Sequence, residues 1–141
     1  MLLESVKTGI KKGLETTWIL AKTIVPVYIF VTILNHTPVI NWITVIFEPL
    51  MGIFNLPGEA AIVLVVGNLL NLYAAIGAIK AIELTAAQVT ILAIMLSFSH
   101  SLLVETAVTR KLGFKVSHAL IIRMGLAIIF GIIVGRVGAI I

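Results

Sequence analysis

The chain has 141 residues, of which 60% are hydrophobic and only 11% are charged, and its mean hydropathy is +1.20. Soluble domains carry about 25% charged residues, so this composition excludes an ordinary soluble globule and a disordered chain and predicts an integral membrane protein. The net charge is +4, but the basic residues flank apolar runs, as they do when they orient a membrane protein, so we expect no nucleic-acid binding. The absence of cysteine from the sequence excludes disulfides and thiolate metal sites.

The N-terminal region is predicted to hold two helices. Residues 2–15 (LLESVKTGIKKGLE) place apolar side chains at helical spacing, with the lysines mostly on the other side, which predicts an amphipathic helix on the membrane surface. The alternative is a polar extension of the next helix. Residues 16–36 are long enough to span about 30 Å of hydrocarbon. Within them Trp18 suits the membrane interface, Lys22 can reach back towards it, and Pro26 predicts a kink.

Two apolar stretches follow that are poor candidates for simple spans. The stretch 39–54 is too short to cross a membrane, so we expect an interfacial or packing helix there. Residues 57–82 are long enough to cross once, but Gly67, Asn68 and Asn71 lie at their centre, where amide side chains are expensive in lipid. The alternative is a re-entrant hairpin with two arms of about 12 residues, each reaching roughly 18 Å.

The C-terminal part is predicted to hold two more helices. In the first, residues 85–112, Thr85 is the expected N-cap, and the sequence RKLG at 110–113 places cations and then glycine where a helix ends. Residues 116–141 form the last predicted span. Its glycines, Gly131, Gly135 and Gly138, would let another helix approach closely, within the chain or in an oligomer.

The distribution of basic residues favours the hairpin over a full crossing. With the N-terminus inside, a hairpin at 57–82 places the three basic residues of 110–115 on the same side as the three lysines of 7–12, against Lys80 and Arg136 outside. If residues 57–82 crossed the membrane fully, this excess of basic residues on one side would nearly disappear. The positive-inside rule requires such an excess, so it favours the hairpin. We therefore predict an all-α integral membrane protein with about three transmembrane helices, one re-entrant helical hairpin and amphipathic interfacial helices. We expect it in the cytoplasmic membrane with a cytoplasmic N-terminus.

A group of polar residues interrupts the most apolar part of the chain, in the stretch FSHSLLVETAVTRKLG that begins at Phe98. Ser97, Ser101 and Glu105 recur every four residues, so on one helix they form a stripe within about 80°, with His100 beside it. Each serine alone is explained by a bond to its own backbone, and Glu105 by snorkelling to the basic helix end. Together with the central asparagines, the group favours a shared polar pocket.

Three motifs carry a resemblance to a known family. NLPGEAA at 55–61, GNLLN at 67–71 and SHSLLVETA at 99–107 resemble the nucleoside-recognition (Gate) domain family. That domain occurs in concentrative nucleoside transporters, in the membrane part of the ferrous-iron transporter FeoB and in paired spore-maturation membrane proteins. The resemblance covers residues from about 40 to 141, so it implies a Gate-like domain at 39–141 after the N-terminal helices of 1–38.

The resemblance also implies a site. In the nucleoside transporters, hairpin tips meet the unwound middle of the following helix and bind substrate there, so the sequence SFSHS should be where the helix of 85–112 breaks. The predicted substrate-binding residues are Glu59, Asn68, Asn71, Ser97, Ser99, His100, Ser101, Glu105 and Thr106.

Two functions remain open from the sequence. The first is a membrane transport subunit of the Gate type that binds a small solute at mid-membrane, and the second is a structural or assembly subunit that keeps the fold without transporting. An intramembrane enzyme is disfavoured, because there are three histidines, no Asp, no HExxH and no GxSxG. We expect no metal or cofactor and leave a coupling Na⁺ or H⁺ open. The expected partners are a small solute such as a nucleoside, the lipid bilayer, and a second copy or a second Gate-like subunit, because the two-unit transporters pair inverted units and no internal repeat is visible here.

Overall fold

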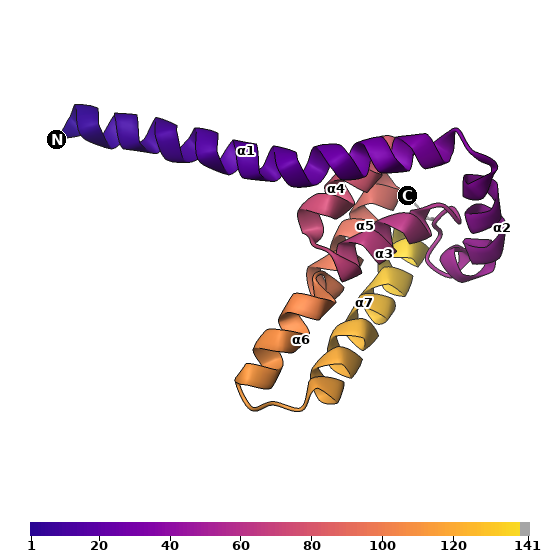
Figure 1. Ribbon diagram of the computed structural model, residues 1–141. Coiled ribbons are helices and arrows are strands. Elements are labelled where there is room, and N and C mark those ends of the chain that lie inside the picture. Colours follow the sequence, from indigo (N-terminus) through magenta and orange to yellow (C-terminus); the bar gives the residue numbers. More distant parts are fainter. Residues whose placement is uncertain (139–141) are drawn as a thin grey trace.

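The computed structural model describes residues 1–138, which form helices joined by short connections (Figure 1). The helices are α1 (Leu2–Asn35), α2 (Pro38–Gly52), α3 (Ala60–Leu69), α4 (Leu72–Ala81), α5 (Ala86–Ser99), α6 (Leu102–Lys111) and α7 (Val116–Gly138). No strand occurs among the described residues, and three stretches of them are long and apolar enough to cross a membrane, namely α1, α5 taken together with α6, and α7. The predicted all-α fold with about three such helices is confirmed. The last three residues of the predicted span 116–141 lie outside the described part.

Helix α1 is one continuous helix of 34 residues. Two separate helices were expected at 2–15 and 16–36, but no break divides them. The alternative, in which the first stretch extends the spanning helix, is the one observed. Pro26 lies inside α1 without ending it. The N-terminal half of α1 runs out from the body of the molecule (Figure 1). The Nζ atom of Lys22 lies 5.3 Å from the Trp18 ring centroid, so this lysine does reach back towards the N-terminal end.

The C-terminal half of α1 packs along α4, because α4 presents small residues to it. Ala74, Ala75 and Ala78 are buried on α4. A Cβ atom added to Gly77 would lie 2.6 Å from the Ile24 carbonyl oxygen, so the two backbones are in contact there. This close approach fixes the position of α4 on the first spanning helix.

Helices α3 and α4 form a helical hairpin that turns at residues 70–71, close to the central amides singled out in the sequence. The side-chain oxygen of Asn71 accepts a hydrogen bond from the Ala74 amide at 2.9 Å and caps α4. Each helix has ten residues and is about 15 Å long, roughly half of the hydrocarbon thickness.

Helix α7 packs along α5 and against the segment after α2, and its glycines make these contacts close. A Cβ atom added to Gly131 would lie 2.8 Å from the Met95 sulfur, and one added to Gly135 would lie 2.3 Å from the Phe54 carbonyl oxygen. These two glycines therefore make their predicted close contacts inside the chain, and neither is free to contact another subunit. At Gly138 no atom of the described residues lies within 4 Å of an added Cβ.

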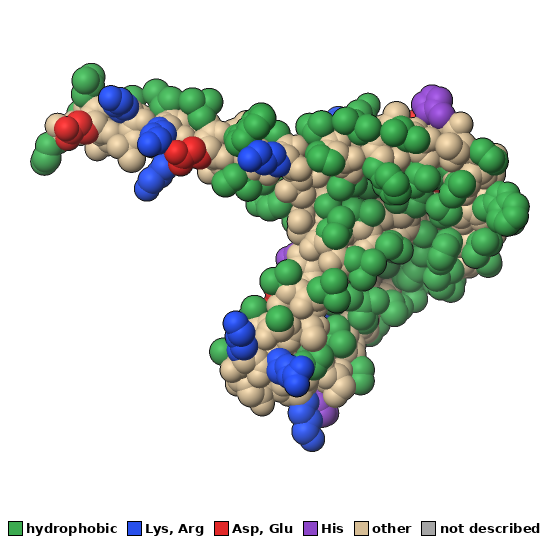
Figure 2. Space-filling view, in the orientation of Figure 1, with side chains coloured by type: hydrophobic (Ala, Val, Ile, Leu, Met, Phe, Trp, Pro, Cys, Tyr) green, Lys and Arg blue, Asp and Glu red, His purple; other side chains and the backbone are tan. Residues whose placement is uncertain are grey.

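The outside of the body is apolar, as Figure 2 shows for one face. Large side chains such as Trp42 and Ile121 are 74% and 70% exposed, whereas Ile91, Leu92 and Leu96 on α5 are fully buried. Water-soluble monomers rarely expose contiguous apolar area on this scale, so lipid is the natural surrounding of this surface.

We expect Gly135→Ala to destabilise the protein, because its methyl group would meet the Phe54 backbone, which cannot rotate away as a side chain can. Overpacking of this kind costs about 1–3 kcal/mol. Gly125→Ala is the matched control on the same helix, because nothing lies within 4 Å of its added Cβ. Thermal unfolding in detergent should show a clear loss for Gly135→Ala only. Equal unfolding temperatures for the two variants would contradict a close contact between α7 and the Phe54 backbone.

Candidate functional site

The helix predicted at 85–112 is broken where the sequence SFSHS indicated. Helix α5 ends at Ser99 and α6 begins at Leu102, and Ser101 has left-handed backbone angles with φ at 53° and ψ at 41°. The Ser101 amide donates to the carbonyl oxygen of Gly67 at 2.9 Å, outside its own helix. A left-handed residue other than glycine costs roughly 1–2 kcal/mol, so this bond helps to hold an unfavourable conformation in place.

Gly67 makes this contact possible because it has no side chain. A Cβ atom there would lie 2.6 Å from the buried Leu96 side chain, so α3 and α5 are in close contact at this point. The Gly67 carbonyl lies in the last turn of α3, where a carbonyl oxygen has no amide donor within its own helix. Residues 67–71, here called the hairpin end, thus meet the helix break at residues 100–101, as the family resemblance implied.

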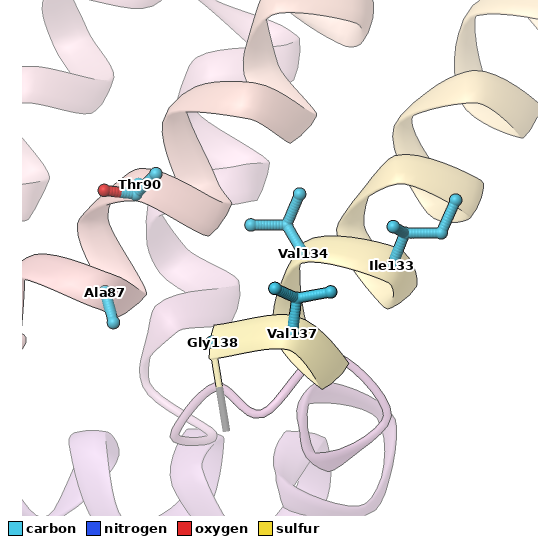
Figure 3. A pocket seen from close by; sticks show the side chains of 6 residues that line it. All are labelled: Ala87, Thr90, Ile133, Val134, Val137 and Gly138. Atoms are coloured by element: carbon cyan, nitrogen blue, oxygen red, sulfur yellow. The ribbon is translucent and has the colours of Figure 1, made fainter. Parts of the chain in front are cut away.

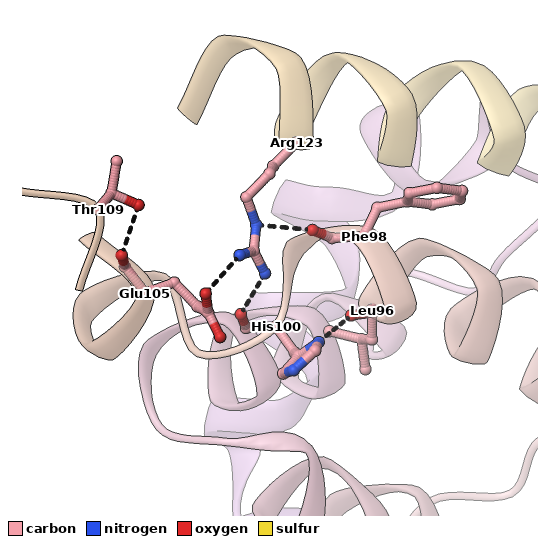
Figure 4. Close-up of polar contacts among 6 residues, drawn as sticks. All are labelled: Leu96, Phe98, His100, Glu105, Thr109 and Arg123. Carbon is pink, nitrogen blue, oxygen red and sulfur yellow. Dashed lines mark hydrogen bonds and ion pairs between the residues drawn. The ribbon is translucent and has the colours of Figure 1, made fainter. Parts of the chain in front are cut away.

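Arg123 of α7 bonds to groups on both sides of the helix break (Figure 4). Its Nε atom donates to the Phe98 carbonyl at 2.8 Å, and Nη2 donates to the His100 carbonyl at 3.0 Å. Its Nη1 atom lies 3.0 Å from Oε2 of Glu105 on α6. Carbonyls at a helix C-terminus carry partial negative charge, so a guanidinium is a suitable partner for the end of α5. One side chain therefore joins α5, α6 and α7.

Arg123 is not among the residues predicted from the sequence, although a signal was present. The residue stands alone in the apolar run LIIRMGL, and a cation inside a membrane helix is expensive unless it is paired. The alternative that Glu105 snorkels to the basic helix end is wrong in this structure, because its partner is Arg123.

The other polar side chains before the break bond to their own helix. Ser97 Oγ donates to the Ile94 carbonyl at 2.7 Å, Ser99 Oγ to that of Met95 at 3.0 Å, and His100 Nδ1 to that of Leu96 at 2.8 Å. The predicted stripe of Ser97, Ser101 and Glu105 is wrong, because it assumes one continuous helix through Ser101. Of the three residues before the break, Ser99 is buried and Ser97 is exposed.

The remaining predicted residues lie apart from one another. Asn71 is occupied in capping α4. Glu59 precedes α3, about 15 Å from the hairpin end, with its Oε2 atom 3.4 Å from the Thr44 hydroxyl. Thr106 is half-buried next to Glu105 on α6. The nine predicted residues thus do not line one cavity within the described chain, and their role in substrate binding stays a prediction.

An apolar groove of about 390 Å³ lies beside the contact between the hairpin end and the break. It is lined by Phe47, Leu50, Met51, Phe54, Ala61, Leu64, Val65, Asn68, Leu69, Met95, Leu102, Met124 and Ile128, from α2, α3, α5, α6, α7 and the segment after α2. Asn68 is the one polar residue in this lining, and it directly follows Gly67. Its Oδ1 atom is buried and has no hydrogen-bond partner among the described residues.

A second hollow, of about 400 Å³, lies between the start of α5 and the end of α7 (Figure 3). It is lined by Ala87, Thr90, Ile133, Val134, Val137 and Gly138. The Thr90 hydroxyl already donates to the Ala86 carbonyl at 2.8 Å. This hollow therefore lacks the unsatisfied polar group that distinguishes the groove at Asn68.

A hairpin whose end meets a broken helix is the arrangement that the family resemblance implied. Comparison with known families identifies the same family. The model of the Gate family, described as nucleoside recognition, matches residues 17–115, and the chain belongs to this family. The match begins earlier than the resemblance read from the motifs and ends before α7, so it includes much of α1 and leaves Arg123 outside.

One curated relative is the uncharacterized membrane protein YvoD of Bacillus subtilis (strain 168). It is 46% identical over 129 residues, which are 92% of this chain and 41% of that protein. The chain thus spans less than half the length of this relative. No solved structure matches the chain.

We expect Arg123→Met to lower the free energy of unfolding by about 2 kcal/mol, because hydrogen bonds to charged groups contribute roughly 1.5–3 kcal/mol. Arg136→Met, at an exposed residue of the same helix, is the control and should change little. In a double-mutant cycle, adding Glu105→Gln to Arg123→Met should cost less than Glu105→Gln does alone. Chemical unfolding in detergent micelles measures the four proteins of the cycle and the Arg136→Met control. Additive effects would show that the two side chains do not interact.

Proposed function

We propose that the chain is a transport subunit of the Gate type, which binds a small uncharged solute in the groove beside the helix break. The observation that carries the proposal is the contact of the hairpin end with the break, at 2.9 Å between the Ser101 amide and the Gly67 carbonyl oxygen, next to a groove with an unsatisfied amide. Binding sites in membrane transporters are commonly built where helices are interrupted, because the freed backbone groups and polar side chains face a cavity there.

The lining of the groove indicates what kind of solute it suits. Phe47, Phe54 and the methionines 51, 95 and 124 provide aromatic and polarisable contacts, and none of the lining residues is charged. A buried polar atom without a partner is unfavourable, so a solute that bonds to the Asn68 amide would relieve that cost. A flat heterocycle such as a nucleobase, alone or as part of a nucleoside, fits these requirements better than a charged metabolite does.

Arg123 and Glu105 have a different role in this proposal. The two side chains are paired with each other, and Arg123 also bonds to the end of α5, so they position the break rather than contact the solute. The hydroxyls of Ser97 and Ser99 are likewise bonded to their own helix. These bonds are the observation that favours the alternative, a structural or assembly subunit whose polar residues only complete the fold.

A partner subunit is part of the proposal. The groove is open on one side, and the matched relative is more than twice as long as the part that aligns. A second copy of this chain or a second Gate-like unit would close the groove and supply the polar groups that a nucleoside sugar needs. Since Gly131 and Gly135 are occupied inside the chain, that contact would use another surface.

We expect Asn68→Leu to weaken solute binding about tenfold or more, because it removes the groove's one polar side chain. The measurement is equilibrium binding of radiolabelled uracil, adenine, uridine and adenosine to the protein in detergent and in vesicles. Ser97→Ala is the matched control, because Ser97 is exposed and bonded to its own helix. Binding by none of the four solutes, or equal binding by wild type and Asn68→Leu, would favour the structural alternative.

The α3–α4 hairpin is proposed to be re-entrant from the outer side of the membrane, with the N-terminus in the cytoplasm. Cysteines replacing Ile53 and Glu83, two exposed residues that flank the hairpin, should then react with an impermeant maleimide from the same side. Cysteines replacing Lys11 and Lys115 should react only from the other side. The sequence contains no cysteine of its own that would interfere. Labelling of the Ile53 and Glu83 positions from opposite sides would show that residues 57–82 cross the membrane.

A further inference from the structure

The end of the α6–α7 arm carries a concentration of positive charge. Residues 110–118, here called the basic tip, contain Arg110, Lys111, Lys115 and His118, all exposed, and no acidic residue. Among residues 1–138 the ion pairs are Lys11 with Glu15 and Arg123 with Glu105, so the three cations of the tip are not neutralised by the described chain. Figure 2 shows these cations together at the lower end of the molecule.

The backbone of the basic tip has a defined turn. Gly113 has a φ angle of +79°, and its amide donates to the Arg110 carbonyl at 3.2 Å. The next amide, that of Phe114, donates to the Thr109 carbonyl at 3.2 Å. These two bonds are the pair that ends a helix in a Schellman motif. The tip is therefore a shaped turn, which holds the charges of α6 close to the first turn of α7.

A cavity of about 590 Å³ lies in the angle between the two helices at this turn. Its lining includes Lys115, His118 and Thr109, with Gly113 and Phe114 from the turn itself. The Thr109 hydroxyl already donates to the Glu105 carbonyl at 2.7 Å, so Lys115 and His118 are the side chains that can donate into the cavity. Because the lining offers these two basic side chains without a carboxylate, its chemistry suits an anion.

The same turn also exposes large apolar side chains. Leu112 is 67% exposed and Phe114 is 70% exposed, on either side of Gly113. Side chains of this kind between cations are typical of segments that sit at the boundary of headgroups and acyl chains. They distinguish a lipid from a soluble anion, because only a lipid supplies hydrocarbon beside its phosphate.

We propose that the basic tip is a binding site for the headgroup of an anionic phospholipid. Lys115 and His118 face the phosphate in the cavity, Arg110 and Lys111 add attraction to the charged leaflet, and Leu112 and Phe114 enter the acyl region. The site is independent of solute binding in the groove, because it lies at the far end of the α6–α7 arm.

The N-terminal part of α1 offers a matched comparison within the same chain. It carries Lys7, Lys11 and Lys12, but also Glu4 and Glu15, and Lys11 lies 3.9 Å from Glu15. Replacing these three lysines by glutamine removes as much positive charge as the triple variant Arg110→Gln, Lys111→Gln, Lys115→Gln does at the tip. A difference between the two variants therefore reports on the site and not on net charge.

The test is native mass spectrometry of the full chain in detergent, titrated with phosphatidylglycerol or with phosphatidylcholine of the same acyl chains. We expect wild type to prefer phosphatidylglycerol, the tip variant to lose that binding by roughly tenfold or more, and the α1 variant to stay within about threefold of wild type. Equal losses in the two variants, or no preference for the anionic lipid, would overturn the proposal.

Two further measurements distinguish a lipid site from a site for soluble phosphates. Leu112→Ser with Phe114→Ser should weaken phosphatidylglycerol binding although the charge is unchanged, and millimolar glycerol 3-phosphate should not displace the lipid. Full displacement by glycerol 3-phosphate would identify a site for soluble phosphates and reject the lipid site. Circular dichroism checks that each variant keeps its helices, and if the triple variant does not fold, Lys115→Gln alone is compared with Lys11→Gln by the same criteria.

Discussion

The structure depends on how the backbone groups freed at the helix break are satisfied in an apolar environment. An interrupted helix leaves carbonyls at one end and amides at the other, and lipid offers no partner for either. In this chain the Ser101 amide bonds to the Gly67 carbonyl, and Arg123 bonds to the carbonyls of Phe98 and His100. The break is therefore stable only while α3 and α7 stay in place against it. This requirement ties the helical hairpin, the broken helix and the last helix into one unit.

Small residues set the distances within that unit. Gly67 brings α3 onto α5, Gly77 brings α4 onto α1, and Gly135 brings α7 against the segment after α2. At each position a Cβ atom would lie closer than 3.0 Å to a neighbouring atom. The close neighbour is a backbone atom at Gly77 and Gly135 and the buried Leu96 side chain at Gly67. Such contacts leave little room for sliding, so the groove beside Asn68 is bounded by elements with fixed separations. The groove is thus a consequence of the same packing that stabilises the break.

Local signals in the sequence predicted the two ends of the broken helix. Thr85 caps the start of α5 in a reciprocal capping box with Gln88, and Gly113 ends α6 in a left-handed conformation. Both features depend on side chains within four residues, which a sequence pattern contains. The break at His100 and Ser101 was expected only from the family resemblance, because its partners Gly67 and Arg123 are distant in the sequence. The continuity of α1 was left open, because its amphipathic first half is compatible with a surface helix and with an extended one.

Long-range partners could not be predicted in the same way. The ion pair of Arg123 with Glu105 joins residues 18 positions apart across a turn, and the groove needs side chains from five helices. The spacing of Gly131 and Gly135 indicated a close helix contact, but only the fold shows that Met95 and Phe54 of the same chain provide it. Of the nine polar residues predicted to form a site, four have side chains that bond to their own helix or cap one, namely Asn71, Ser97, Ser99 and His100.

The central claim is that the hairpin end contacts the start of α6, and a cysteine pair tests it most directly. Leu69 and Leu102 both line the groove, one from each side of this contact. In the variant Leu69→Cys, Leu102→Cys, a short bifunctional thiol reagent should join the two positions in membranes, and should leave the control pair Leu69→Cys, Val137→Cys unlinked. Efficient linking of the first pair only is the predicted result. Failure of the first pair to link, with both cysteines shown to be reactive, would contradict the contact between the hairpin end and the helix break.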